Sequence, residues 1–303
     1  MKRLLLDKQV LSWAIYDWAN SAFATTVMAG FFPLFFKQYW SAGLESTEST
    51  FHLGAGNAVA SLLIVLTAPL LGAIADRGSL RKRFLFFFAL TGIIATAVLS
   101  GVGIGEWLAA IMFFVVATIG FMGANVFYDA LIVTVAKEED WDVVSAFGFA
   151  LGYLGGGLLF AVNVAMTLSP ESFGLQNATE AVQMSFITVA VWWLLFSLPL
   201  MLLVKEPKTP TAISGLAVAR AGYVQLIETF KHLRKLRIVF LFLLAYWLYI
   251  DGVDTIVRMA VDYGLSIGLE QNHLITALLI TQFVGFPAAL GFGILAKKLG
   301  PEG

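Results

Sequence analysis

The chain has 303 residues, of which 59% are hydrophobic and only 13% are charged, and its mean hydropathy is +0.84. Values this high exclude an ordinary soluble domain and indicate a protein with several membrane spans. The net charge of -1, with the basic residues gathered between apolar runs, excludes a nucleic-acid-binding surface. The absence of cysteine excludes disulfides, thiolate metal sites and cysteine nucleophiles.

Eight apolar runs reach the length of about 20 residues that a helix needs to cross the hydrocarbon core of a bilayer. They lie at 12–36, 53–75, 84–104, 107–135, 147–168, 183–204, 238–262 and 273–296. With the N-terminus in the cytoplasm, 17 of the 19 Lys and Arg fall in cytoplasmic segments, which leaves only Lys37 and Arg258. This bias predicts an integral multi-pass membrane protein with a cytoplasmic N-terminus, and we expect its membrane to be a bacterial inner (plasma) membrane.

The longest segment between spans predicts a cytoplasmic linker at 206–237. Its second part repeats apolar residues at helical spacing, which indicates a short amphipathic helix, and then becomes basic. These basic residues either only enforce the topology, which is the favoured interpretation, or contact anionic lipid head groups. The apolar positions are Tyr223, Leu226, Ile227, Phe230 and Leu233. We therefore expect three parts: a six-helix bundle over 1–205, the linker over 206–237 and a partial second bundle of two spans over 238–303.

The turn after the second span carries a recognisable motif. Its matching positions are Gly72, Ile74, Ala75, Asp76 and Arg77. Together with the order of six spans, a long linker and further spans, this turn resembles the major facilitator superfamily. The resemblance implies an all-α bundle of two six-span halves, of which this chain holds the first half and two further spans, so that it looks truncated after span eight. In the family Gly72 would allow a close helix approach, and Asp76 would meet a helix N-terminus.

The first span has a polar stripe on one face, formed by Trp13, Asp17, Asn20, Ser21 and Ala24. A carboxylate within a span costs a few kcal/mol on insertion scales, so Asp17 should face a cavity or a partner. The segment Trp13–Phe23, which includes Tyr16, resembles the opening of the vacuole-effluxer family within the superfamily.

The seventh span has a matching stripe of Trp247, Asp251, Asp254, Arg258 and Asp262, spaced 4, 3, 4 and 4 residues apart. We expect Asp17, Asp251 and Asp254 to line one central cavity, with Arg258 balancing them or binding an anionic group such as a carboxylate. The alternative is a structural ion pair of Asp254 with Arg258 that serves only insertion and packing.

The fourth span places Asn125, Tyr128 and Asp129 on one face near its cytoplasmic end. No basic residue occurs between Arg83 and Lys137, so the arginine that many proton antiporters of the superfamily carry in this helix has no counterpart. The run Phe127–Leu131 and the acidic residues that follow the span also resemble cation-coupled sugar symporters of the glycoside type. Asp129 could steady the cytoplasmic gate or touch the solute.

The fifth span is rich in glycine, and Gly148, Gly152, Gly156 and Gly157 fit the superfamily's antiporter signature, with Tyr153 in place of its proline. Glycines at this spacing let two helices approach closely and slide. Glycines of this kind more often serve plain packing contacts, so they do not by themselves indicate antiport.

These patterns predict a secondary transporter that moves a small solute by alternating access. The family resemblance implies efflux or uptake of an amino acid with a coupling proton or sodium ion, without a cofactor or a metal. The alternatives are a cation-coupled sugar symporter and a transport-incompetent fragment or receptor-like protein. No pair of residues has the spacing of a nucleophile and its base, so we expect no catalytic site and no enzyme.

Overall fold

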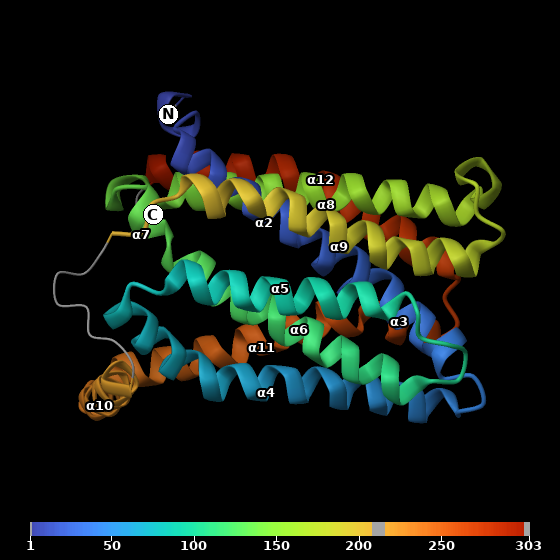
Figure 1. Cartoon of the computed structure of the whole chain (residues 1–303), viewed down its shortest axis with the longest axis horizontal. Coiled ribbons are helices and arrows are strands. Elements are labelled where there is room, and N and C mark those ends of the chain that lie inside the picture. The colour runs from blue at the N-terminus through green and yellow to red at the C-terminus, as the bar shows by residue number, and fades with distance from the viewer. Residues whose placement is uncertain (1, 208–215, 300–303) are drawn as a thin grey trace.

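The computed structural model describes residues 2–207 and 216–299, and these residues form helices and connections without any strand (Figure 1). Eight helices are long and apolar enough to cross a membrane, which confirms the predicted all-α membrane fold. The first span is continuous from Lys8 to Trp40 but changes its helical type along the way. It consists of α2 (Lys8–Ala22), the π-helix η1 (Phe23–Phe31), α3 (Phe32–Phe35) and the π-helix η2 (Phe36–Trp40).

The remaining spans are single long helices, two of which have a short extension. They are α4 (Ser46–Gly78), α5 (Arg81–Leu99), α6 (Trp107–Ala130) followed by α7 (Ile132–Val135), α8 (Trp141–Leu168) preceded by the 3-10 helix η3 (Glu138–Asp140), α9 (Ala178–Leu203), α11 (Arg237–Ser266) and α12 (Gln271–Leu299). The short helices α1 (Lys2–Leu5) and η4 (Pro170–Phe173) lie outside the spans, and so does α10 (Leu216–Leu233), which covers the predicted amphipathic segment.

Some helices begin or end at other residues than the predicted apolar runs, because hydrogen-bonded caps and turns fix their ends. The first span begins at Lys8 because the Asp7 carboxylate accepts hydrogen bonds from the backbone N–H groups of Gln9 and Val10. The third span was predicted to reach residue 104 but stops at Leu99. The chain turns there through a glycine-rich segment in which Gly105 adopts a φ of +78°.

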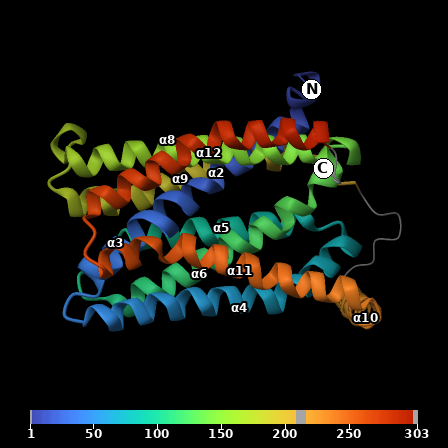
Figure 2. The same cartoon turned by 180° about the vertical axis from the view of Figure 1, so that it is seen from behind.

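The bundle has two distinct ends (Figures 1 and 2). The α10 end holds the N-terminal residues, the turn between α4 and α5, η3 and α10. The opposite end, here called the Lys37 end, holds the connections from η2 to α4, from α5 to α6, from α8 to α9 and from α11 to α12. Every membrane-spanning helix therefore runs from one of these ends to the other.

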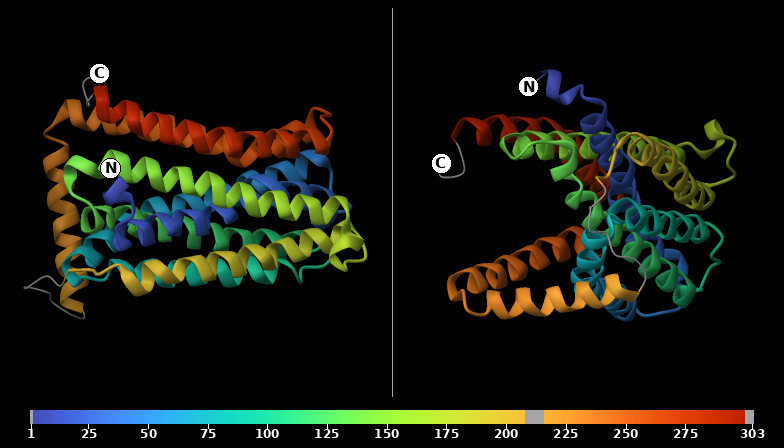
Figure 3. Two further views of the ribbon diagram at one scale, coloured as in Figure 1. Left: turned by 90° about the horizontal axis from the view of Figure 1, so that it is seen from above. Right: turned by 60° about the vertical axis from the view of Figure 1, so that its left-hand side comes forward.

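The first six spans form the main core, with the first span at its centre. Large aromatic side chains are fully buried there, among them Tyr16, Phe23, Phe32, Trp40 and Trp193. α2 packs along α8 and α9, and α5 packs along α6. The last two spans add to this core on one side, since α12 packs along α8 while α11 contacts η1, α3 and α4. Figure 3 shows that α11 and α12 meet at the Lys37 end and diverge towards the α10 end.

The glycines of α8 explain how closely it approaches the first span. A Cβ atom would lie 2.9 Å from the Trp13 ring at Gly148 and 2.7 Å from the Thr25 hydroxyl at Gly156. At Gly157 the added atom would instead meet Gln282 of α12 at 2.9 Å. The glycine stripe thus serves contacts with two different neighbours of α8.

The motif after the second span makes other contacts than those expected. A Cβ atom at Gly72 would meet nothing within 4 Å in the described part of the chain, so no close helix approach occurs there. The Asp76 carboxylate accepts a hydrogen bond of 2.8 Å from Arg81 Nε instead of capping a helix. The side chain of Arg77 lies outside the described residues.

Candidate functional site

One cavity of about 370 Å³ lies between α2, α6 and α8 towards the α10 end, and we call it the Asp17 pocket. Its lining residues are Trp13, Asp17, Asn125, Tyr128, Asp129, Ile132, Ser145 and Phe149. Two residues with a carboxylate, one with an amide and two with a hydroxyl thus line one space inside the membrane-spanning bundle. No Lys, Arg or His is among the residues that line it. Such a space attracts cations and hydrogen-bond donors.

Aromatic stacking holds the wall of the Asp17 pocket. The Trp13 and Tyr128 rings are stacked with centroids 4.4 Å apart, and Trp13 Nε1 donates a hydrogen bond of 3.0 Å to the backbone carbonyl of Tyr128. This clamp ties α2 to α6 one turn away from Asp17. The Tyr128 hydroxyl is buried and has no hydrogen-bond partner among the described residues. It can therefore donate or accept a hydrogen bond beside the two carboxylates.

The other predicted polar residues of the first and fourth spans lie around this pocket. Asn20 is buried and its amide donates to the side-chain oxygen of Asn125, which joins α2 to α6. The Ser21 hydroxyl donates a hydrogen bond of 3.3 Å to Asp17. Tyr16 is fully buried, with its ring centroid 5.0 Å from that of Tyr128, and it does not line the pocket.

A second cavity of about 300 Å³ lies between α4 and α11, and we call it the Arg258 pocket. Its polar lining comes from Asn57, Ser61, Asp251, Asp254, Thr255 and Arg258. Arg258 is 7% exposed, and its guanidinium donates to Ser61 Oγ at 3.0 Å and forms an ion pair with Asp254 at 3.2 Å. Arg258 is the sole basic residue in this lining. The seventh span thereby contacts a helix of the first six.

The expected single cavity is divided in two in the described part of the chain. Asp17 and Asp129 line the Asp17 pocket, whereas Asp251 and Asp254 line the Arg258 pocket. The reason lies in the packing, because α11 contacts α4 and the η1 and α3 segments of the first span rather than α2. Periodicity within one helix shows which residues share a face of that helix. It does not show which other helix packs against that face.

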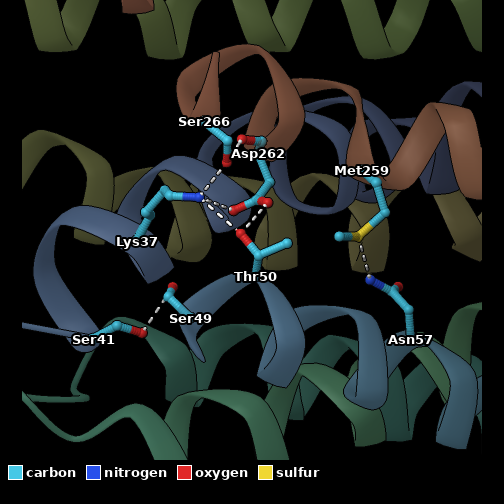
Figure 4. Close-up of polar contacts among 8 residues, drawn as sticks. All are labelled: Lys37, Ser41, Ser49, Thr50, Asn57, Met259, Asp262 and Ser266. Atoms are coloured by element: carbon cyan, nitrogen blue, oxygen red, sulfur yellow. Dashed lines mark hydrogen bonds and ion pairs between the residues drawn. The ribbon is translucent and has the colours of Figure 1, made fainter. Parts of the chain in front are cut away.

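A third polar cluster was not predicted as a unit (Figure 4). Lys37 of η2 forms an ion pair with Asp262 of α11 at 2.9 Å and donates to Thr50 Oγ1 and Ser266 Oγ. The sequence contains one signal for it, since Lys37 is one of the two basic residues that do not follow the charge bias. Asp262 is fully buried. No group of three or more His, Asp or Glu suited to a metal occurs among residues 2–207 and 216–299.

The family model described as "Vacuole effluxer Atg22 like" matches residues 7–141 and 134–302. An uncharacterized MFS-type transporter YxiO of Bacillus subtilis is 38% identical over 98% of this chain and 69% of its own length. Autophagy-related protein 22 of Saccharomyces cerevisiae is 21% identical over 92% of this chain and 67% of its own length. This chain therefore spans about two thirds of the length of these relatives.

The crystal structure of a D-xylose-proton symporter matches with a TM-score of 0.54 and 15% identity, covering 95% of this chain and 67% of that one. A match at this identity shows that the two share a fold. The family model covers almost the whole chain. The protein therefore belongs to the Atg22-like vacuole effluxer family, within the major facilitator superfamily.

Proposed function

We propose that this protein is a secondary active transporter that moves a small solute across the membrane by alternating access. Membership of the effluxer family and the fold shared with a symporter support this proposal. The main observation in support of this function is the Asp17 pocket. Two carboxylates face one cavity there without a basic side chain. Asp17 is partly buried within the first span, where a charge costs several kcal/mol unless it has a partner, and Asp129 is exposed in the last turn of α6.

The Asp17 pocket is the proposed site of the coupling cation, either a proton or a sodium ion. Asp17 and Asp129 supply the negative charge, and Asn125 and Tyr128 supply neutral polar groups beside it. A cation that binds both carboxylates offsets their repulsion and their loss of hydration. Asp129 could also steady the gate at the α10 end, because it lies in the last turn of α6.

The Arg258 pocket is the proposed site of the solute. Its guanidinium provides two parallel donors that match a carboxylate, and Asp251 provides a negative charge for an ammonium group in the same cavity. A zwitterion fits this pair of charges, which favours amino-acid efflux or uptake. Because Arg258 already contacts Ser61 and Asp254, a solute carboxylate would replace one of these partners.

The charge distribution supports an orientation with the α10 end in the cytoplasm of a bacterial plasma (inner) membrane. Lys and Arg are concentrated at the α10 end, while in the described chain the half of the bundle towards the opposite end holds only Lys37 and Arg258. Under this orientation the segments 1–205, 206–237 and 238–303 are the first bundle, a cytoplasmic linker beside anionic lipid head groups, and the start of the second bundle.

A cation-coupled sugar symporter is the second candidate, favoured by the fold shared with the D-xylose-proton symporter. The experiment is uptake by proteoliposomes loaded with the purified protein, with imposed proton or sodium gradients. Radiolabelled amino acids and glycosides are compared in parallel. Gradient-driven uptake of an amino acid supports the proposal, and gradient-driven uptake of a glycoside supports the symporter instead. Failure to bind or move any solute would identify a transport-incompetent or receptor-like protein.

A further inference from the structure

The polar cluster at the Lys37 end connects the two halves of the chain. Lys37 and Thr50 come from the first two spans, and Asp262 and Ser266 come from the last turns of the seventh. Lys37 Nζ lies 2.9 Å from Asp262 Oδ1, while Thr50 Oγ1 donates to Asp262 Oδ2 at 2.7 Å. Both carboxylate oxygens of a fully buried aspartate are therefore bonded to the other half.

An apolar layer lies directly beneath these polar contacts. It brings together Phe31 and Leu34 of the first span, Phe160 and Val164 of α8, Val261 of α11 and Ile275 of α12. The buried residues of α11 are confined to its last third, from Arg258 to Gly264, and nearly all residues before Arg258 are exposed in the described chain. Among the described residues, the seventh span thus buries side chains against the first six mainly at this end.

We infer that Lys37, Thr50, Asp262 and Ser266 form a contact, here called the latch, that keeps the transporter closed on its non-cytoplasmic side. The opening between the two bundles on that side is here called the mouth. The inference rests on the proposed alternating access and on the proposed orientation. A mouth that opens in each cycle needs a contact that water can replace, and an ion pair with hydroxyl partners at helix ends meets that need. Lys37 keeps 11% of its side chain exposed, so water reaches the pair from that side.

The geometry distinguishes this contact from an ordinary buried ion pair that only stabilises the fold. Its four residues lie at the ends of helices whose other ends diverge towards α10 (Figure 3). A second state in which α11 tilts about its middle would separate Asp262 from Lys37 while leaving each half intact. Two such states, each closed at one end, are what alternating access requires.

The test uses the natural absence of cysteine in this chain. Ala58→Cys places one thiol in the Arg258 pocket, and the protein is reconstituted in vesicles of known orientation. A membrane-impermeant thiol reagent is then added from the Lys37 side. In the Lys37→Met and Asp262→Asn variants we expect the labelling rate to rise about tenfold, which corresponds to about 1.4 kcal/mol in the opening equilibrium.

Two further sets of variants keep the test decisive if loss of one charge impairs folding. Thr50→Val retains the ion pair and should give a smaller increase, and the exchange of Lys37→Asp with Asp262→Lys should return the rate towards that of the parent. Glu45→Gln is the matched control, since Glu45 is exposed at the same end. Labelling at the parent rate in the folded Thr50→Val, Lys37→Met and Asp262→Asn variants would overturn the latch. Because labelling is measured without solute, this result is independent of whether any solute is transported.

Discussion

A Cβ atom at Gly152 of α8 would lie 3.1 Å from the carboxyl carbon of Asp17 and 2.6 Å from the hydroxyl oxygen of Ser21. The α8 helix therefore fits beside Asp17 because residue 152 has no side chain. This contact connects the glycine stripe of the fifth span to the carboxylate that we propose for ion coupling.

The Gly152→Ala substitution should lower the stability of the bundle by about 1–3 kcal/mol, the usual cost of overpacking a tight contact. It should also displace Asp17 and reduce transport. The measurement is the thermal unfolding temperature of the purified protein in detergent. Gly291→Ala is the control, since nothing lies within 4 Å of the added atom and alanine favours a helix. Equal unfolding temperatures for the two variants would contradict the close contact.

The start of α5 and the end of α9 cap each other at the α10 end. The Glu206 carboxylate accepts hydrogen bonds from the backbone N–H groups of Arg81 (2.9 Å) and Lys82 (3.2 Å), while Lys82 Nζ donates to the carbonyl of Met201. We predict that Glu206→Ala lowers the free energy of unfolding by about 0.5–2 kcal/mol, the range for loss of a helix cap. Unfolding in graded denaturant measures it. Glu138→Ala, at an exposed position of the same end, should change stability by a smaller amount.

Arg258 is predicted to bind the solute as well as to balance Asp254. Arg258→Met should weaken the affinity for a carboxylate-bearing solute by about 10- to 100-fold, because a hydrogen bond to a charged group contributes about 1.5–3 kcal/mol. Adding Asp254→Asn should restore part of the lost stability and none of the affinity. Solute binding by the double variant at the parent affinity would show that the pair only serves insertion and packing.

Asp251 lies in the Arg258 pocket and is exposed there. We predict that Asp251→Asn abolishes or uncouples transport while membrane insertion and unfolding temperature stay unchanged, because an exposed carboxylate contributes little to stability. The assay is solute uptake normalised to the amount of inserted protein. Glu270→Gln, an exposed position in the turn before α12, is the matched control. Unchanged uptake kinetics in Asp251→Asn would remove this residue from the solute pathway.

The sequence alone predicted the number of spans and the charged residues that line the two pockets, while the lining residues from α4 were missed. A charged side chain within a membrane span is energetically costly. Asp17, Asp129 and Arg258 can therefore be recognised in the sequence without knowledge of their neighbours. Which of them share a pocket depends on helix pairing, and periodicity within one helix carries no information on that. The same limit hid the Lys37–Asp262 pair, whose members lie 225 residues apart.

The π-helical part of the first span also had no signal in the sequence. The segment Phe23–Phe31 is apolar except for Thr25 and Thr26 and follows the same pattern as an ordinary span. Its helical type depends on tertiary contacts, such as the tight fit of Gly30 against Phe160 at 3.0 Å from an added Cβ. The helix ends at Lys8 and Leu99 likewise depended on caps and turns that hydropathy does not describe.

The most direct test of the account is the effect of Asp17→Asn and Asp129→Asn on gradient-driven uptake in proteoliposomes. The control is Asp142→Asn, which changes an exposed carboxylate at the start of α8. The account predicts that both pocket variants lose the dependence of the initial uptake rate on an imposed proton or sodium gradient, while Asp142→Asn keeps it. Uptake by Asp17→Asn and Asp129→Asn that follows the gradient and the pH as in the parent protein would contradict the proposed coupling site.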